Sequence, residues 1–553
     1  MEVAAILLTC TFVLLTITNI VRVKYVIRSK WSMPVIVLLT PVAVFASILL
    51  LPLLSVFWVY RELIRLYLIM KQRSKFIGLI KGADVIYTCG PHEKSVMTIL
   101  FMLECSTARK PEDVYQDFKG AVFKALFSDP RKLPEFRSVV KRCGGYSYLC
   151  NGNVTVDECV KKMKVVKCER KELNEDELRV LLQNCVAEEF PRNNTLFMDS
   201  FVGTQPVEWS GYTKTNVSYY PALVRIHHAI CDGFAVTQMF AAMSDKPKNA
   251  DESRKTLYNE NLKQGSRMKS IAYYFLLFWT TIIFNSSEVL LKFLLDKPKP
   301  NILRGGRLTG IEMLSMKTDA GAYYKRIKAI KNSLDEVGFA DVVLTAFSAS
   351  LKDHFRKQSS HHPESISIVV PFLPKATTIP LLPIGELMPH DISLQNSFAM
   401  LTFDLPLFID DDNASLSFRL RAVQRERKRA YNSIGNKILY FTSHFLMQVL
   451  PLPILTMVHD KLHWSAVLSI LPGPPKASVA NGSAEIENIV FWPPLLTGIG
   501  VSVSILSYAN KMQLGLKFDK ALMGNEEDAL DILDGVFKYI DLFTEEINLY
   551  KIN

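Results

Sequence analysis

The sequence lacks the cysteine patterns that mark disulfide frameworks and zinc sites. It contains no CxxC pair, its nine cysteines are an odd number, and none of them follows Cys231. Free thiols in a reducing compartment are the simplest interpretation. One alternative stays open: four cysteines fall close together between Cys143 and Cys168, and a local disulfide there would imply a lumenal domain. The six N-x-S/T sequons permit glycosylation without requiring it.

The sequence also lacks the signatures of nucleic-acid binding. There is no zinc-finger spacing, RNP-like aromatic motif or basic low-complexity arm, so the net charge of +11 needs another explanation. Basic residues near the N-terminus lie beside apolar runs, which is typical of anchors to anionic lipid headgroups at a cytosolic membrane face. They are Arg22, Lys24, Arg28, Lys30, Arg61, Arg65, Lys71, Arg73 and Lys75. We therefore expect a membrane partner and no nucleic-acid partner.

Two apolar runs near the N-terminus predict a membrane anchor. Residues 3–21 carry no charge and are just long enough to span a bilayer. A signal peptide is the rival interpretation, but Glu2 replaces a basic start and no small-x-small site precedes Arg22. Residues 33–60 form the second run, which Pro34, Pro41 and Pro52 interrupt. We expect this run to turn back as a hairpin, returning the rest of the chain to the cytosol.

The remaining chain predicts an α/β protein of two domains. No segment repeats with a period of about 20–50 residues, which excludes repeat architectures. Ordinary charge density and short strands alternating with helices follow residue 82, and an apolar stretch at 271–295 predicts either a membrane-associated linker or a buried interdomain helix. We divide the chain into a membrane anchor (1–75), an N-terminal domain (76–265), a membrane-associated linker (266–300) and a C-terminal domain (301–553).

Individual elements follow from hydrophobic periodicity. In the first half, strands are expected at 95–103 and 221–227, and helices at 111–126 and from Gly233 to Met243. In the second half, helices are expected at 341–356 and 414–431, and strands at 366–370, 499–507 and 512–518.

The run His227-His228-Ala229-Ile230-Cys231-Asp232-Gly233 carries the clearest chemical signal. A histidine where a strand ends can face a cleft, and a near-neutral imidazole can take a proton from an alcohol and return it to a thiolate. We expect Asp232 to hold the loop's shape by pairing with a local arginine, such as Arg225, instead of touching substrate. Gly233 would give backbone freedom or room for close approach. A metal site is not predicted, because adjacent side chains on an extended segment diverge.

His227-His228-x-x-x-Asp232-Gly233 resembles the HHxxxDG signature of the wax ester synthase/diacylglycerol acyltransferase (WS/DGAT) family, with His228 as its catalytic histidine. Further segments match family elements in the right order across about residues 80–540. They are Gly82-Ala83-Asp84, which resembles a strand lead-in, Thr195–Asp199, Val337–Leu344, Ile368–Pro371, Leu394–Asn396, Leu468–Pro474, Gly498–Gly500, Ser507-Tyr508 and Asp519. The chain departs from the family pattern at Ala340, Ile470 and near Lys375.

The resemblance implies two chloramphenicol-acetyltransferase-like domains with a tunnel at their interface and His228 inside it. It implies acyl-CoA as co-substrate, a lipid alcohol as acceptor, and no permanently bound cofactor. Ser507 and Asn396 are the candidate donors to the oxyanion. We expect location at the endoplasmic reticulum or lipid droplets, with catalytic domains in the cytosol. Two alternatives stay open: a degenerate lipid-binding or transfer relative, and a secreted or lumenal glycoprotein.

Overall fold

The computed structural model of the chain describes most of both halves. The described residues are 2–26, 31–129, 133–168, 170–190, 197–209, 214–245, 290, 291, 295, 300–304, 307–319, 321–359, 361–372, 394, 396, 398–409, 415–432, 444–459, 464–473, 476–496 and 498–552. Most of the apolar stretch at 271–295, and Lys375, lie outside them.

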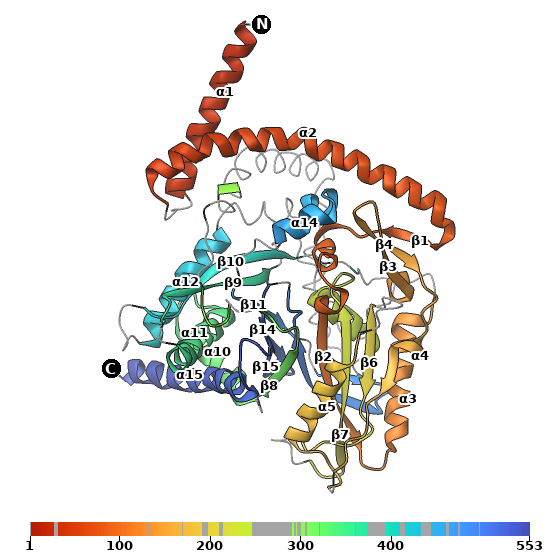
Figure 1. The fold of residues 1–553 in the computed structure, drawn as a ribbon. Coiled ribbons are helices and arrows are strands. Elements are labelled where there is room, and N and C mark those ends of the chain that lie inside the picture. The colour runs from red at the N-terminus through yellow and green to blue at the C-terminus, as the bar shows by residue number, and fades with distance from the viewer. Residues whose placement is uncertain are drawn as a thin grey trace, which may run out of the picture.

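The N-terminal runs form two helices, α1 (Glu2–Val21) and α2 (Met33–Gln72). The predicted hairpin is wrong, because α2 continues through Pro41 and Pro52 as a single helix. Pro34 lies in the first turn of the helix, where a main-chain N–H has no partner within the helix anyway. Pro41 and Pro52 each remove one main-chain hydrogen bond, and the long apolar helix on either side continues despite this loss. Figure 1 shows α2 curving across one end of the molecule while α1 extends away from it. By length and composition alone, Val3–Lys24 and Met33–Lys75 could each cross a membrane.

A six-stranded sheet carries the first half, in the order β12-β13-β2-β7-β6-β5. Its strands β2 (Val96–Ser106) and β7 (Val217–His227) pair antiparallel along their whole length and are almost entirely buried. The other strands are β5 (Val160–Lys162), β6 (Met198–Val202), β12 (Ser478–Val479) and β13 (Ala484–Trp492). Helices α3 (Pro111–Val122), α4 (Val156–Cys159), α5 (Glu175–Ala187) and α6 (Gly233–Met243) accompany this sheet. The predicted strands and helices of this half are confirmed.

Two further sheets complete the fold. A small one of β1 (Phe76–Leu79), β4 (Tyr146–Asn151) and β3 (Ser138–Cys143) packs against the end of α2 through Ile64 and Leu68. The large C-terminal sheet has the order β10-β9-β11-β14-β15-β8. Its strands are β8 (Glu312–Thr318), β9 (Ser365–Phe372), β10 (Ala399–Pro406), β11 (Ala466–Pro472), β14 (Val501–Tyr508) and β15 (Lys511–Asp519). Its helices are α10 (Ala322–Ser333), α11 (Phe339–Gln358), α12 (Leu416–Asn432) and α15 (Glu526–Ile552). Helix α14 (Leu452–His459) instead packs through Leu452 and Leu455 against Ile80 and Val85 of the first half.

The two halves interlock instead of lying side by side. Strand β13 comes from the second half of the chain but pairs with β2 of the first, placing Trp492 opposite Thr98. Strands β12 and β13 therefore belong to the N-terminal sheet. The expected boundary between residues 265 and 301 falls mainly on residues outside the described ones. At Leu291, which is described, the chain is buried against Val23, just after α1, and against Ile36 and Ala43 of α2.

Candidate active site

His228 follows directly after β7, where the chain leaves the N-terminal sheet. Its main-chain N–H donates to Ser95 O at 2.8 Å, while the N–H of His227 donates to Phe197 O on the other side. The two side chains diverge accordingly. The ring of His227 is fully buried and meets Phe197 in a T-shaped contact, with 5.7 Å between the ring centroids. The ring of His228 stacks on Tyr87 at 4.2 Å and meets Phe398 edge-on at 5.9 Å.

The environment keeps the His228 ring neutral. Burial lowers the pKa of His228 to about 4, and its main chain and the Asn396 side chain offset this only in part. Among the described residues, no partner lies in hydrogen-bond geometry with its Nδ1. A neutral imidazole at pH 7 has a lone pair available to accept a proton, as a general base requires.

Asp232 shapes the loop, but by a different contact from the one predicted. Its Oδ1 accepts from Ala235 N at 2.8 Å, so Asp232 is the N-cap of α6. The expected pairing with Arg225 is wrong. Arg225 forms a two-pronged ion pair with Asp199 at 2.8 and 2.5 Å, because β6 and β7 place these two residues directly opposite each other.

Gly233 is required for close approach between the two halves. A Cβ atom at this position would lie only 2.6 Å from Cδ1 of Leu471, a residue of β11 in the C-terminal sheet. Of the two reasons foreseen for the glycine, close packing is therefore the one that the structure supports.

Asn396 is brought next to His228 from the second half of the chain. Its Nδ2 donates to the main-chain oxygen of His228 at 2.6 Å and to Oδ1 of Asp84 at 2.7 Å. The main-chain N–H of Asn396 donates to the same Asp84 oxygen at 2.8 Å. Because an amide nitrogen has two hydrogens, both are committed, and this geometry does not support the predicted oxyanion role of Asn396.

Sequence reasoning missed Asp84 and Tyr87 as site residues. The segment expected as a strand lead-in is a 3-10 helix, Gly82–Thr88, which carries both side chains to His228. Burial raises the pKa of Asp84 to about 7, the Asn396 hydrogen bonds lower it, and the nearby Asp232 charge raises it. The match of Gly82-Ala83-Asp84 to a family element was the available signal, but it pointed to a strand lead-in and not to a site residue.

Ser507 lies at the end of β14 and contacts the loop after β11. Gly473 N donates to the main-chain oxygen of Ser507 at 2.7 Å, and Ser507 lies opposite Pro472 in the sheet. Its hydrogen bonds among the described residues do not include His228, so the oxyanion role of Ser507 stays a prediction. The other matched residues are structural: Asp341 caps α11 and pairs with Arg427 at 2.5 Å, and Asp519 binds Thr309 N at 2.9 Å.

The described residues form neither a disulfide bond nor a cluster of metal ligands at this site. All nine cysteines are free thiols, including the four between Cys143 and Cys168, so the structure contains no local disulfide there. Within the described residues, no group of three His, Cys, Asp or Glu side chains could hold a metal ion.

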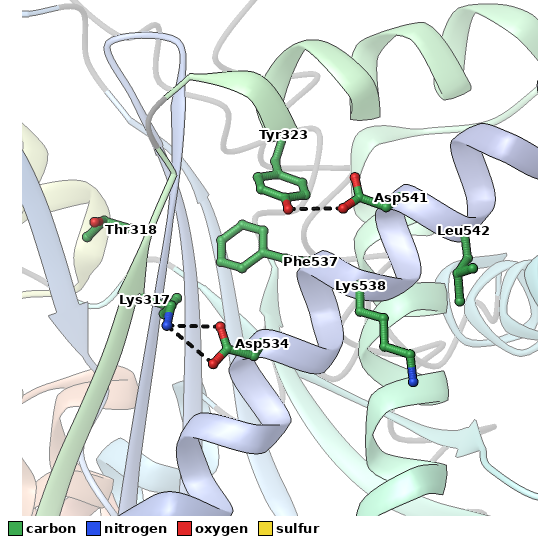
Figure 2. Close-up of a pocket in the computed structure, with 8 residues that line it drawn as sticks. All are labelled: Lys317, Thr318, Tyr323, Asp534, Phe537, Lys538, Asp541 and Leu542. Atoms are coloured by element: carbon green, nitrogen blue, oxygen red, sulfur yellow. Dashed lines mark hydrogen bonds and ion pairs between the residues drawn. The ribbon is translucent and has the colours of Figure 1, made fainter. Parts of the chain in front are cut away.

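A separate pocket of about 460 Å³ lies in the C-terminal half, between β8, α10 and α15 (Figure 2). Its charged residues already have partners. Lys317 pairs with Asp534 at 3.0 Å, and the Tyr323 hydroxyl donates to Asp541 at 3.1 Å. The pocket contains none of the predicted site residues.

Comparison with known proteins identifies the C-terminal part directly. Residues 394–540 match the family model described as the WS/DGAT C-terminal domain. Residues 394–540 are a WS/DGAT C-terminal domain. This match confirms the family that the sequence motifs indicated, and it covers Asn396, Leu471 and Ser507. No curated protein sequence matches the chain.

The structure also resembles two solved proteins at low sequence identity. The wax ester synthase/diacylglycerol acyltransferase from Marinobacter aquaeolei VT8 is 13% identical with a TM-score of 0.54, and the match covers 85% of this chain and 100% of that one. The TRI3 trichothecene 15-O-acetyltransferase from Fusarium sporotrichioides is 12% identical with a TM-score of 0.53, covering 84% and 94%. These likenesses show the fold, and the predicted α/β architecture of WS/DGAT type is confirmed.

Proposed function

We propose that this chain is a membrane-associated O-acyltransferase that moves a long-chain acyl group from acyl-CoA to a lipid alcohol. The acceptor is a fatty alcohol, giving a wax ester, or diacylglycerol, giving triacylglycerol. The observation that carries the proposal is a buried, neutral His228 at the end of β7, inside a WS/DGAT-type fold, where residues of both halves meet.

The reaction needs one base and no covalent enzyme intermediate. A ring nitrogen of His228 takes the proton of the acceptor hydroxyl as its oxygen attacks the thioester carbonyl. The tetrahedral intermediate then collapses, the carbon–sulfur bond breaks, and the imidazolium returns the proton to the leaving thiolate of CoA. The products are an ester and free CoA. Stacking on Tyr87 supports this role, because it restricts the ring to one orientation.

The N-terminal helices support the choice of acceptor. Both α1 and α2 expose large apolar side chains along most of their length, which water disfavours and lipid does not. An acceptor dissolved in the same membrane would reach the enzyme without crossing water. In this proposal the protein resides in the endoplasmic reticulum, reaches lipid droplets, and keeps His228 on the cytosolic side. Free thiols at all nine cysteines favour this side over a lumenal one.

The test is an acceptor panel with labelled acyl-CoA, using membranes from cells that express the full chain. We expect labelled ester and released CoA with a lipid alcohol, and loss of both in His228→Ala. His354→Asn is the matched control, because His354 is also a buried histidine but lies on α11. Undiminished ester synthesis by His228→Ala would contradict the mechanism.

A non-catalytic lipid-binding relative is the second candidate, and the departures at Ala340 and Ile470 favour it. Both residues lie on the C-terminal elements α11 and β11, where Ile470 pairs with Ile505 of β14. This candidate predicts binding of an acyl lipid without any CoA release. The acceptor panel therefore distinguishes the two candidates.

A further inference from the structure

Three segments that are far apart in the sequence meet at the main chain of His228. The 3-10 helix Gly82–Thr88 supplies Asp84, the end of β7 supplies His228, and the residues before β10 supply Asn396. Asp84 and Asn396 are 312 residues apart, yet Asp84 accepts two hydrogen bonds from Asn396, at 2.7 and 2.8 Å. Asn396 then donates to His228 O at 2.6 Å.

We propose that Asp84 and Asn396 form a clamp that positions the proposed base, His228, through its main-chain carbonyl. Asp84 orients the Asn396 amide, and that amide holds the carbonyl. This inference rests on the proposed acyl transfer at His228 and deepens it, because neither Asp84 nor Asn396 needs to touch substrate.

The hydrogen bonds around His228 show why the clamp matters. Ser95 O accepts the N–H of His228, and Asn396 donates to its carbonyl, so both polar groups of this peptide are held. The carbonyl lies just beyond the last residue of β7, where the strand ladder stops and a side chain supplies the donor instead. A shift of about 1 Å in a catalytic group can lower a rate by about 100-fold.

Asn396 is itself held from a third direction. A ring nitrogen of His444 lies 3.0 Å from the main-chain oxygen of Asn396. His444 also packs on Gly82, since a Cβ atom there would lie 2.9 Å from the His444 ring. The 3-10 helix is therefore joined to the second half of the chain twice, through Asp84 with Asn396 and through Gly82 with His444.

The desolvation of the Asp84 carboxyl argues against a purely stabilising role. The groups that act on this part-buried carboxyl are Asn396, Asp232 and Glu135, and desolvation is the largest influence on its pKa. Ionising an acid in such surroundings costs stability, and costs of this kind are typical of functional sites. A neutral side chain would hold the two segments together at a lower cost.

The test compares Asp84→Leu, Asn396→Asp and the double variant Asp84→Asn/Asn396→Asp in the full chain. Asp84→Leu removes the acceptor of the Asn396 amide, and Asn396→Asp replaces that amide by a carboxylate that faces Asp84. The double variant restores a donor–acceptor contact between the two side chains but leaves His228 O without its donor. We expect kcat for ester formation to fall at least about 10-fold in all three, with KM unchanged within about twofold, and melting temperature to recover only in the double variant.

Asp341→Asn is the control, because Asp341 is a buried capping carboxylate that pairs with Arg427, remote from His228 in the sequence and in its contacts. We expect it to lower the melting temperature with kcat retained. Recovery of kcat together with stability in the double variant, or normal kcat in Asn396→Asp, would overturn the clamp.

A second measurement does not depend on activity. Hydrogen exchange of the main chain around residues 227–229 should be faster in Asp84→Leu and in the double variant than in the wild type and Asp341→Asn. Unchanged exchange would overturn the clamp even if the wild type made no ester. Ester synthesis by the wild type with normal kcat in every variant would overturn the clamp alone, whereas no synthesis with any acceptor would overturn the proposed function.

Discussion

Leu471 occupies the space that a side chain at Gly233 would need, with its Cδ1 2.6 Å from the position of a Cβ atom. Gly233 starts α6 in the first half of the chain, and Leu471 lies on β11 in the second. Packing between the two halves therefore requires glycine at the last position of the HHxxxDG run. This position directly follows Asp232, the N-cap of α6, and lies five residues after His228. This contact makes the loop sensitive to changes on β11.

We expect Gly233→Ala to lower ester formation, because the new methyl group forces Leu471 or the start of α6 to move. The loss should be about 10-fold, since only the end of a flexible side chain must give way. Leu471→Ala removes the obstructing atoms. The double variant Gly233→Ala/Leu471→Ala should therefore be more active than Gly233→Ala alone, as measured by kcat. Equal activity of the single and double variants would show that the contact does not matter.

The low pKa of His228 predicts an unusual pH profile. Because burial lowers this pKa to about 4, the base stays neutral, and the rate should hold from about pH 8 down to about pH 5. An exposed histidine would lose activity near pH 6.5. The steady-state rate of ester formation, measured against pH with saturating acyl-CoA, checks this. Loss of half of the rate near pH 6.5 would contradict a pKa of His228 that is lowered by burial.

The same shift affects stability. The unfolded chain binds a proton at His228 near pH 6.5 and the folded chain only near pH 4, so this contribution is fully present above pH 6.5 and is lost as the pH falls to 4. At pH 5 the loss relative to neutral pH is about 2 kcal/mol. We expect His228→Asn to show a smaller decrease in melting temperature between pH 7 and pH 5 than the wild type. An equal decrease in both proteins would assign the effect to other groups.

The buried pair of Arg225 and Asp199 predicts a strong effect on stability. Their side chains are 4% and 0% exposed, so Asp199→Asn leaves a buried guanidinium without its counter-charge. Removing one partner of such a pair costs about 3–5 kcal/mol. The double variant Asp199→Leu/Arg225→Met should unfold closer to the wild type in thermal denaturation. A double variant less stable than Asp199→Asn would show that Arg225 stabilises the fold by its other contacts, such as its 2.6 Å bond to Glu188 O.

Local patterns predicted the elements well where one physical signal dominates. The buried runs of β2 and β7 and the amphipathic pattern of α11 fix their types without tertiary information. The prolines of α2 were misleading, because a local rule for breaking helices competes with a long apolar segment, and the sequence does not say which prevails. The crossing of β13 into the first sheet depends on strand pairing over long range and has no local signal.

From the residues alone, the site was predicted only where its members are contiguous. Asn396 was named as a site residue through the family resemblance, but with a different role from the contact it makes with His228. His228, Asp232 and Gly233 fall within one motif, and their positions follow from the end of β7. The contacts of Asp232 and Arg225 were misassigned because proximity in sequence suggested a pair, whereas the register of β6 with β7 pairs Arg225 with Asp199. Asp84 and Asn396 meet only through the fold, so their role at His228 could not be derived from spacing.

The exposed apolar faces of α1 and α2 predict that single charges will weaken membrane association. Leu8 and Leu38 are both 72% exposed on these helices. Arginine near the centre of a bilayer-spanning helix costs about 2.5–3.5 kcal/mol, so Leu8→Arg/Leu38→Arg should release more protein from membranes on alkaline carbonate extraction. Val165→Arg is the control, because Val165 is 69% exposed but lies outside both helices. If the double variant and the control stay equally in the membrane pellet, these helices do not carry the membrane association.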